Sequence, residues 1–284
     1  MMGNKNENKE SKIGLTFAPD FSGKVLFMRH GETVFNRSKE FNKSTNPEYN
    51  DAHLSEDGIK QIISIQEEIN KLTFEKVYVS PYYRALQTVA LALEKHPALK
   101  DLTVYVHPKI SEVVCGTHDF IKDIKQSKKD FNMESKVKID WSYFDKYIKE
   151  KNLDENFFYF ENIDRIDEKY KNEIYSKLVK LYYEQESKDE YKKELEKFYK
   201  ESRKNIRRFE SLQHAYDRFK DFKNFLKEEH KETINDNKNK ILCVSHSTFI
   251  NTAIDPDLIE AEKNKKNQSK SYDIKNGEII SVFI

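Results

Sequence analysis

The fold is decided by Lys24-Val25-Leu26-Phe27-Met28-Arg29-His30-Gly31-Glu32-Thr33, an apolar run that stops abruptly at charged and polar residues. A short apolar run with such a boundary predicts a buried strand over Lys24 to Met28 and a loop after it. Similar runs predict further strands at Lys76 to Val79, Thr103 to Val106, Ile241 to Val244 and, at an edge after the turn Asn276-Gly277, Ile279 to Ile284.

Segments with helical spacing lie between these runs. Leu54 to Leu72 carries apolar residues three and four positions apart, with Ser55 as a candidate N-cap. A second helix is expected after Ser80-Pro81, and Leu212 to Leu226 predicts a third. Strands that alternate with helices predict βαβ units and a mainly parallel sheet, in which functional residues gather beyond the C-terminal strand ends.

Glycine and proline, which mark most chain reversals, are rare in the second half of the chain. Only seven glycines occur in 284 residues; none lies between Thr117 and Asn276, and no proline lies between Pro108 and Pro256. This stretch is therefore expected to be largely helical. We divide the chain into a disordered or loosely packed tail at 1–22, an α/β domain at 23–116 plus 210–284, and a helical insert subdomain at 117–209.

Composition excludes several classes of protein. Fifty Lys and Arg residues are interspersed with 49 Asp and Glu, so no basic stripe is available for nucleic acid. Two distant cysteines, Cys115 and Cys243, show neither disulfide nor metal-ligand spacing. No run approaches the roughly 20 apolar residues of a membrane span, and the first dozen residues are polar. We therefore expect a cytoplasmic protein with no nucleic-acid partner and no membrane span.

Four basic side chains are expected to meet at one edge of the sheet. His30 and His246 each follow an apolar run, although more than 200 residues separate them, and Arg29 adjoins the first. Arg84 follows the second strand by a few residues. Two arginines and two histidines around a helix N-terminus predict a strong anion site, because guanidinium groups bind phosphate oxygens bidentately.

These residues resemble the signature of the histidine phosphatase superfamily, the phosphoglycerate mutase-like proteins. The resemblance rests on five ordered segments, which cover about 24–116 and 210–254: Arg29-His30-Gly31-Glu32-Thr33 with Asn36, Asp51 to Gly58 with Gln61, Ser80-Pro81-Tyr82-Tyr83-Arg84-Ala85-Leu86-Gln87-Thr88, Glu112 with Gly116, and Glu210-Ser211 with Arg218 followed by Ser245-His246. The sequence departs from the family pattern at His53, where proline is usual, and at Ser247, where many members have glycine.

The resemblance implies a three-layer α/β sandwich with a mainly parallel sheet and a long helical insertion. It also implies a phosphoryl transfer in which His30 attacks phosphorus through Nε2 while a backbone carbonyl holds its other nitrogen. Glu112 would protonate the leaving oxygen. The phosphate-binding residues would be Arg29, Arg84, His246, Thr33 and Asn36. Neither a metal nor a cofactor is required, because the arginines supply the positive charge.

The sequence leaves several alternatives open. The preferred function is a phosphatase for a small phosphorylated metabolite or a phosphoprotein. One alternative is a phosphoglycerate mutase. The other is a catalytically weak or inactive family member that acts as an interaction or assembly subunit through its helical insert. Glu32 or an acid of the insert competes with Glu112 for the proton-donor role. The insert could cap the active site or dock a partner, and the other histidines, His118 among them, are treated as structural or solvated.

Overall fold

The computed structural model describes residues 19–40, 43, 46–121, 123–133, 135–184, 188–204, 206–236, 238–264 and 274–282. Most of the predicted tail, residues 1–18, lies outside the described residues, as do the last two positions of the predicted C-terminal strand.

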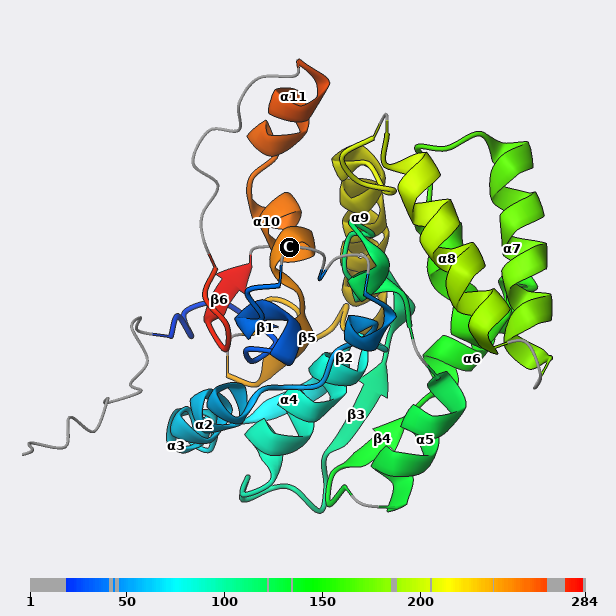
Figure 1. The fold of residues 1–284 in the computed structure, drawn as a ribbon. Helices are drawn as coiled ribbons and strands as arrows, with labels where there is room; N and C mark the ends of the chain where they lie inside the picture. The colour runs from blue at the N-terminus through cyan, green and yellow to red at the C-terminus, as the bar shows by residue number, and fades with distance from the viewer. Residues whose placement is uncertain are drawn as a thin grey trace, which may run out of the picture.

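The described residues form a six-stranded sheet in the order β4-β3-β2-β5-β1-β6 (Figure 1). Its strands are β1 (Val25–Arg29), β2 (Phe74–Val79), β3 (Thr103–Val106), β4 (Lys138–Asp140), β5 (Lys240–Ser245) and β6 (Ile279–Val282). All neighbours pair in parallel except β6, which runs antiparallel to β1 at the edge. The predicted mainly parallel sheet is confirmed.

Helices cover both faces of the sheet, which confirms the predicted three layers (Figure 1). The α-helices are α1 (Val34–Arg37), α2 (Glu56–Ser64), α3 (Gln66–Ile69), α4 (Tyr83–Leu93), α5 (Ile124–Met133), α6 (Ser142–Lys151), α7 (Glu168–Tyr183), α8 (Lys188–Ser202), α9 (Leu212–Glu229), α10 (Ser247–Ile254) and α11 (Asp257–Lys263). Short 3-10 helices are η2 (Pro47–Tyr49), η3 (Pro108–Ile110), η4 (Thr117–Asp119) and η5 (Glu155–Asn162). The predicted helix over 54–72 is divided into α2 and α3, and Ser55 caps α2 by accepting from the Gly58 amide.

The sheet separates two hydrophobic clusters. One cluster joins α2, α3 and α4 to residues of 117–209. The other packs α9, α10 and α11 against the opposite face. The central strands β1 and β5 are buried from both sides, and their sequences are almost continuously apolar, as expected of a parallel sheet.

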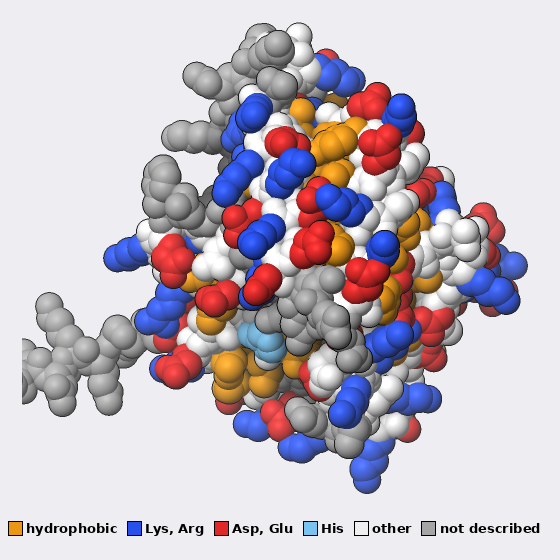
Figure 2. Space-filling view, turned by 45° about the vertical axis from the view of Figure 1, so that its right-hand side comes forward, with side chains coloured by type: hydrophobic (Ala, Val, Ile, Leu, Met, Phe, Trp, Pro, Cys, Tyr) orange, Lys and Arg blue, Asp and Glu red, His pale blue; other side chains and the backbone are white. Residues whose placement is uncertain are grey.

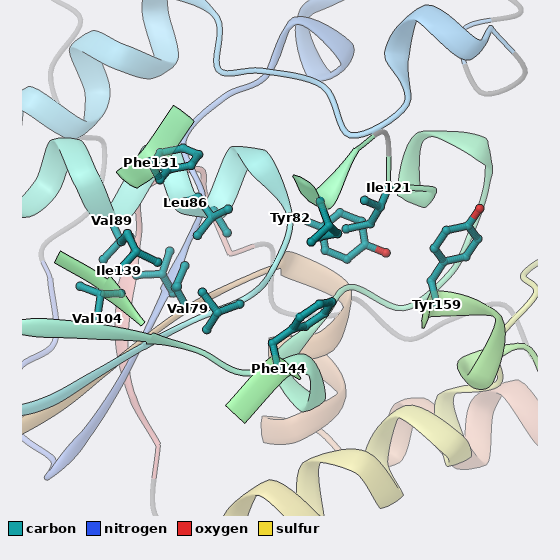
Figure 3. Close-up of a cluster of buried hydrophobic side chains, with 14 of the residues drawn as sticks. Val79, Tyr82, Leu86, Val89, Val104, Ile121, Phe131, Ile139, Phe144 and Tyr159 are labelled. Carbon is teal, nitrogen blue, oxygen red and sulfur yellow. The ribbon is translucent and has the colours of Figure 1, made fainter. Parts of the chain in front are cut away.

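The region 117–209 differs from the predicted helical subdomain in one respect. Its β4 pairs with β3 and extends the main sheet. Side chains of this region, such as Phe131, Ile139 and Phe144, share a core cluster with Val79 and Leu86 of the α/β domain (Figure 3). The region is therefore built into the core of the α/β domain, while α7 and α8 pack against each other at its outer side (Figure 1).

The described surface carries charges of both signs. On the face shown in Figure 2, Lys and Arg side chains are interspersed with Asp and Glu. Among the described residues, no helix is both long enough and apolar enough to cross a membrane.

Candidate active site

The two histidines meet where their strands end. In the register of β1 and β5, Arg29 pairs with Ser245, so His30 and His246 leave the sheet side by side. Their ring centroids lie 5.2 Å apart. Parallel strands bring their C-terminal ends to one edge of a sheet, and the predicted convergence of the two histidines is found in the structure.

The His30 ring is held in one tautomer. Its Nδ1 lies 2.7 Å from the Gly31 carbonyl oxygen, which can only accept a hydrogen bond, so Nδ1 carries the proton. Nε2 then has the free lone pair. Burial lowers the pKa of His30 well below its usual 6.5, and the charges of Arg84 and Arg29 lower this pKa further. The ring is therefore neutral near pH 7.

Neighbouring elements fix the loop that carries His30. Thr88 of α4 accepts a hydrogen bond from the Gly31 amide, and Asn276 donates to the His30 carbonyl. Gly58 at the start of α2 packs directly under this loop, since a Cβ atom there would lie only 2.0 Å from the Glu32 carbonyl oxygen. Only glycine allows the helix to approach so closely.

Arg84 lies in the first turn of α4 and is buried. Its Nε donates to His246 Nδ1 at 3.2 Å, and its Nη2 lies 3.2 Å from Asp119 Oδ1. Nη1 lies 3.7 Å from Asp51 Oδ1, which also accepts the Tyr83 amide at the start of α4. The guanidinium group is thus oriented by three partners from three separate segments.

His246 supports Arg84. Because its Nδ1 accepts from Arg84, its Nε2 carries the proton and donates to Ser80 Oγ at 2.7 Å. The side chain is fully buried and is not one of the residues that line the site cavity. Direct binding of phosphate by His246 therefore stays a prediction, whereas its contact with Arg84 is part of the structure.

Glu112 lies in the loop after η3 and contacts the N-terminal turn of α10. Its Oε1 accepts from its neighbour's amide, Val113 N, at 2.8 Å and from Phe249 N at 3.1 Å. Burial raises the pKa of Glu112, and the nearby charge of Asp119 raises it further, whereas Arg84 lowers it. The net upward shift favours the protonated form that a general acid needs.

Arg218 of α9 holds the Glu112 loop from behind. It forms a two-point ion pair with Glu210 through Nε and Nη2, at 2.8 and 3.1 Å. The same guanidinium group donates to the carbonyls of Lys109 and Ser111, and Glu210 Oε2 accepts the Val114 amide. The motif pair Glu210 and Arg218 thus positions the loop without lining the cavity.

All the predicted residues except His246 line a cavity of about 310 Å³. Its lining includes six predicted residues, namely Arg29, His30, Thr33, Asn36, Arg84 and Glu112. Thr33 and Asn36 also hydrogen-bond each other and cap α1, so the Asn36 Oδ1 is used within the protein and its Nδ2 is the group suited to a phosphate oxygen.

Sequence reasoning missed part of this lining. His118 and Asp119 follow Gly116, and His118 stacks on Phe35 with ring centroids 4.0 Å apart. His118, which the sequence analysis treats as structural or solvated, is thus part of the cavity wall. The available signal was the position of these residues directly after the segment that contains Glu112.

Glu32, another candidate proton donor, lies outside the cavity. Glu32 accepts a hydrogen bond from Ser55 and does not line the cavity. Within the described part of the chain, no group of three or more His, Cys, Asp or Glu side chains is arranged to hold a metal ion.

Comparisons with known proteins agree with the motifs. Residues 25–144 match the family model of the histidine phosphatase superfamily (branch 1). A Schizosaccharomyces pombe protein named probable phosphatase is 26% identical over 107 residues, 36% of this chain and 48% of that protein. The chain therefore spans about half the length of the curated relative it matches.

Solved structures of phosphatases are also similar, at low identity. A phosphoserine phosphatase from Entamoeba histolytica, solved with 3-phosphoglyceric acid, is 20% identical, with a TM-score of 0.39 over 90% of this chain and 87% of that one. A mycobacterial glucosyl-3-phosphoglycerate phosphatase is 13% identical, with a TM-score of 0.42 over 90% and 87%. The family match confirms the resemblance in the motifs over residues 25–144, which match the histidine phosphatase superfamily, branch 1.

Proposed function

We propose that the protein is a phosphatase that hydrolyses a phosphomonoester through a phosphohistidine at His30. The observation that carries this proposal is the His30 ring, which the Gly31 carbonyl holds with Nε2 unprotonated beside a cavity lined by Arg29 and Arg84. A neutral, oriented imidazole next to two cations is what nucleophilic attack on a phosphate dianion requires. The name of the S. pombe relative agrees with this activity.

In the first step, His30 Nε2 attacks phosphorus in line with the ester oxygen. A P–N bond forms, the P–O ester bond breaks, and the Glu112 carboxyl gives its proton to the departing oxygen. Arg84 and Arg29 would stabilise the charge on the equatorial oxygens, with a hydrogen bond from Asn36 Nδ2. Such fixed charges are the main catalytic contribution available to a phosphoryl transfer with a loose transition state.

In the second step, water attacks the phosphohistidine. The Glu112 carboxylate left by the first step takes a proton from this water, the P–N bond breaks, and inorganic phosphate leaves. Glu112 regains its proton and His30 regains its lone pair, so the site returns to its starting state. One carboxyl group thus acts as acid and then as base.

The cavity supports a small phosphorylated metabolite as the substrate. Its volume of about 310 Å³ and its walls of Phe35 and His118 leave room for a compact leaving group beyond the phosphate. A phosphoprotein would have to present its phosphorylated side chain to the same cavity.

The test offers purified protein an aryl phosphate and, separately, 3-phosphoglycerate with its bisphosphate primer, with His30→Ala as the control. We expect hydrolysis of the aryl ester, an acid-labile phosphohistidine in quenched wild-type protein, and loss of both in the variant. Efficient migration of phosphate on phosphoglycerate would favour a mutase. Absence of both turnover and phosphohistidine would refute the enzyme assignment and leave a binding role for the protein.

A further inference from the structure

Asp119 lines the cavity, and the proposed phosphatase mechanism assigns no role to its carboxyl group. It ends the short 3-10 helix η4 and is buried. Its Oδ2 accepts the amides of Cys115 and Gly116 at 2.9 and 3.3 Å, while its Oδ1 lies 3.2 Å from Arg84 Nη2. One oxygen therefore holds the loop that follows Glu112, and the other holds the arginine proposed to bind phosphate.

This arrangement places a negative charge where a phosphate is expected to bind. Arg84 and Asp119 both line the cavity, so a dianion that reaches Arg84 comes close to the Asp119 carboxylate. Asp51 approaches the same guanidinium group at 3.7 Å. Like charges repel strongly in a buried site, and binding a proton to one carboxyl group relieves this repulsion.

We propose that Asp119 is a positioning residue that links proton uptake to dianion binding: it holds Arg84 until a phosphoryl group takes its place, and its charge favours a proton on Glu112. The inference rests on the proposed function, because it assumes that Arg84 receives the phosphoryl group. Binding of substrate would then itself help to supply the proton that Glu112 donates to the leaving oxygen.

The groups that face Asp119 support this role. Arg84 of α4 is its ionic partner, Glu112 is its acidic neighbour, His118 Nε2 lies 3.3 Å from its Oδ2, and the Tyr82 hydroxyl donates to its backbone carbonyl. Burial raises the pKa of Asp119, and Arg84 opposes that rise.

Three histidines of the site, His118, His30 and His246, have lowered pKa values. Burial lowers the pKa of His118 to about 3, and burial also lowers those of His30 and His246 well below 6.5. Among the side chains of the site, we therefore expect proton uptake between about pH 6 and pH 8 at Asp119 and Glu112.

The test uses calorimetric titration of the full chain with sulfate, a tetrahedral dianion that does not itself titrate near neutral pH. Titrations in two buffers of different ionisation enthalpy give the number of protons taken up. For the wild-type protein we expect uptake on the order of half a proton at about pH 7, and sulfate binding roughly tenfold weaker at pH 8 than at pH 6. Sulfate binding without proton uptake would overturn the inference.

The decisive variant is Asp119→Asn, because the amide oxygen of asparagine can still accept the two loop amides while the charge is lost. We expect it to bind sulfate roughly tenfold more tightly than the wild-type protein at about pH 8 and to take up fewer protons. The matched control is Asp145→Asn, which removes a charge from an exposed ion pair with Lys128. Equal sulfate affinities for a folded Asp119→Asn and the wild-type protein would show that Asp119 only holds the loop.

Activity gives an independent measurement. In Asp119→Asn the basic limb of the kcat profile for an aryl phosphate should move to lower pH by about one unit, because Glu112 loses the neighbour that favours its proton. An unmoved limb would contradict the link to Glu112. If the wild-type protein hydrolyses no phosphate ester, the phosphatase proposal fails, but the sulfate titrations still decide the role of Asp119. If Asp119→Asn does not fold, proton uptake by the wild-type protein decides it.

Discussion

Replacing Arg84 with methionine should disable the site and destabilise the fold in a pH-dependent manner. The guanidinium group lies 3.2 Å from Asp119 and 3.7 Å from Asp51, and all three side chains are buried. Methionine fills much of the volume but removes the positive charge that faces both carboxylates. Breaking a buried ion pair in this way costs about 3–5 kcal/mol.

The pH dependence has a definite sign. Burial raises the pKa of Asp119, and Arg84 lowers it. Loss of Arg84 therefore moves the folded-state pKa further above its unfolded value. Such a group binds its proton more tightly in the folded protein, so the free energy of unfolding falls as pH rises from about 4 to about 8. We expect Arg84→Met to lower the free energy of unfolding by the full amount of about 3–5 kcal/mol at about pH 8 and by roughly half of it at about pH 5.5.

The measurement is urea unfolding of the wild-type protein, Arg84→Met and the double variant Arg84→Met/Asp119→Asn at both pH values. The double variant removes one unpaired charge, so it should regain about 1–2 kcal/mol at pH 8. It should not regain turnover, which we expect Arg84→Met to lower about 10²- to 10³-fold. The reasoning is refuted if Arg84→Met loses the same stability at both pH values, or if the second substitution restores none of it.

Three further predictions concern the supports of the site. In Gly58→Ala, the new Cβ would lie 2.0 Å from the Glu32 carbonyl oxygen, so α2 or the loop that carries His30 must move. We expect the free energy of unfolding to fall by about 2–4 kcal/mol and turnover to fall as well. An unchanged Tm would argue against the close packing. Arg218→Lys keeps the charge but loses the fork that holds the loop, so kcat should fall about tenfold or more while sulfate affinity stays unchanged; weaker sulfate binding would place Arg218 in the site itself. Glu112→Gln should lower kcat about 10²-fold or more for alkyl phosphates, whose leaving oxygen needs a proton, and much less for p-nitrophenyl phosphate; equal losses would exclude a general-acid role.

The sequence predicts the sheet well because most of its strands are buried from both sides. A continuous apolar run such as that before His30 has few alternatives to a strand, and the polar residues after it must lie at the sheet edge. The sequence does not predict β4, because this strand lacks a continuous apolar run. Lys138-Ile139-Asp140 contains one apolar residue, and only its pairing with β3 makes it a strand. Its formation depends on a distant partner, which local periodicity does not contain.

In the candidate site, too, some features follow from the sequence and others do not. Segment order brought His30, Arg84 and Glu112 together, because each follows a strand of the parallel sheet. Asp119 was missed because its partner, Arg84, lies 35 residues away in the sequence. The contact of His246 with Arg84 is likewise set by side-chain orientation, which the position of a residue at a strand end does not specify.

Burial of the site explains how two incompatible protonation states coexist. The proposed reaction needs a neutral His30, whose usual pKa is 6.5, and a protonated Glu112, whose usual pKa is 4.5. With those values both conditions would hold in only about one molecule in a hundred at pH 5.5. Burial lowers the pKa of His30 and raises that of Glu112, which brings the two pKa values together or reverses their order.

The charges of the arginines and of Asp119 shift these two pKa values in the same directions as burial does. Arg84 and Arg29 help to keep His30 neutral, and Asp119 helps to keep Glu112 protonated. The acid limb of the activity profile should therefore lie below pH 6.5 and the basic limb well above pH 4.5, which leaves an active window where an exposed His and Glu pair would have almost none. The buried charges of Arg84, Arg29 and Asp119 thus favour the two protonation states that the proposed reaction needs near neutral pH.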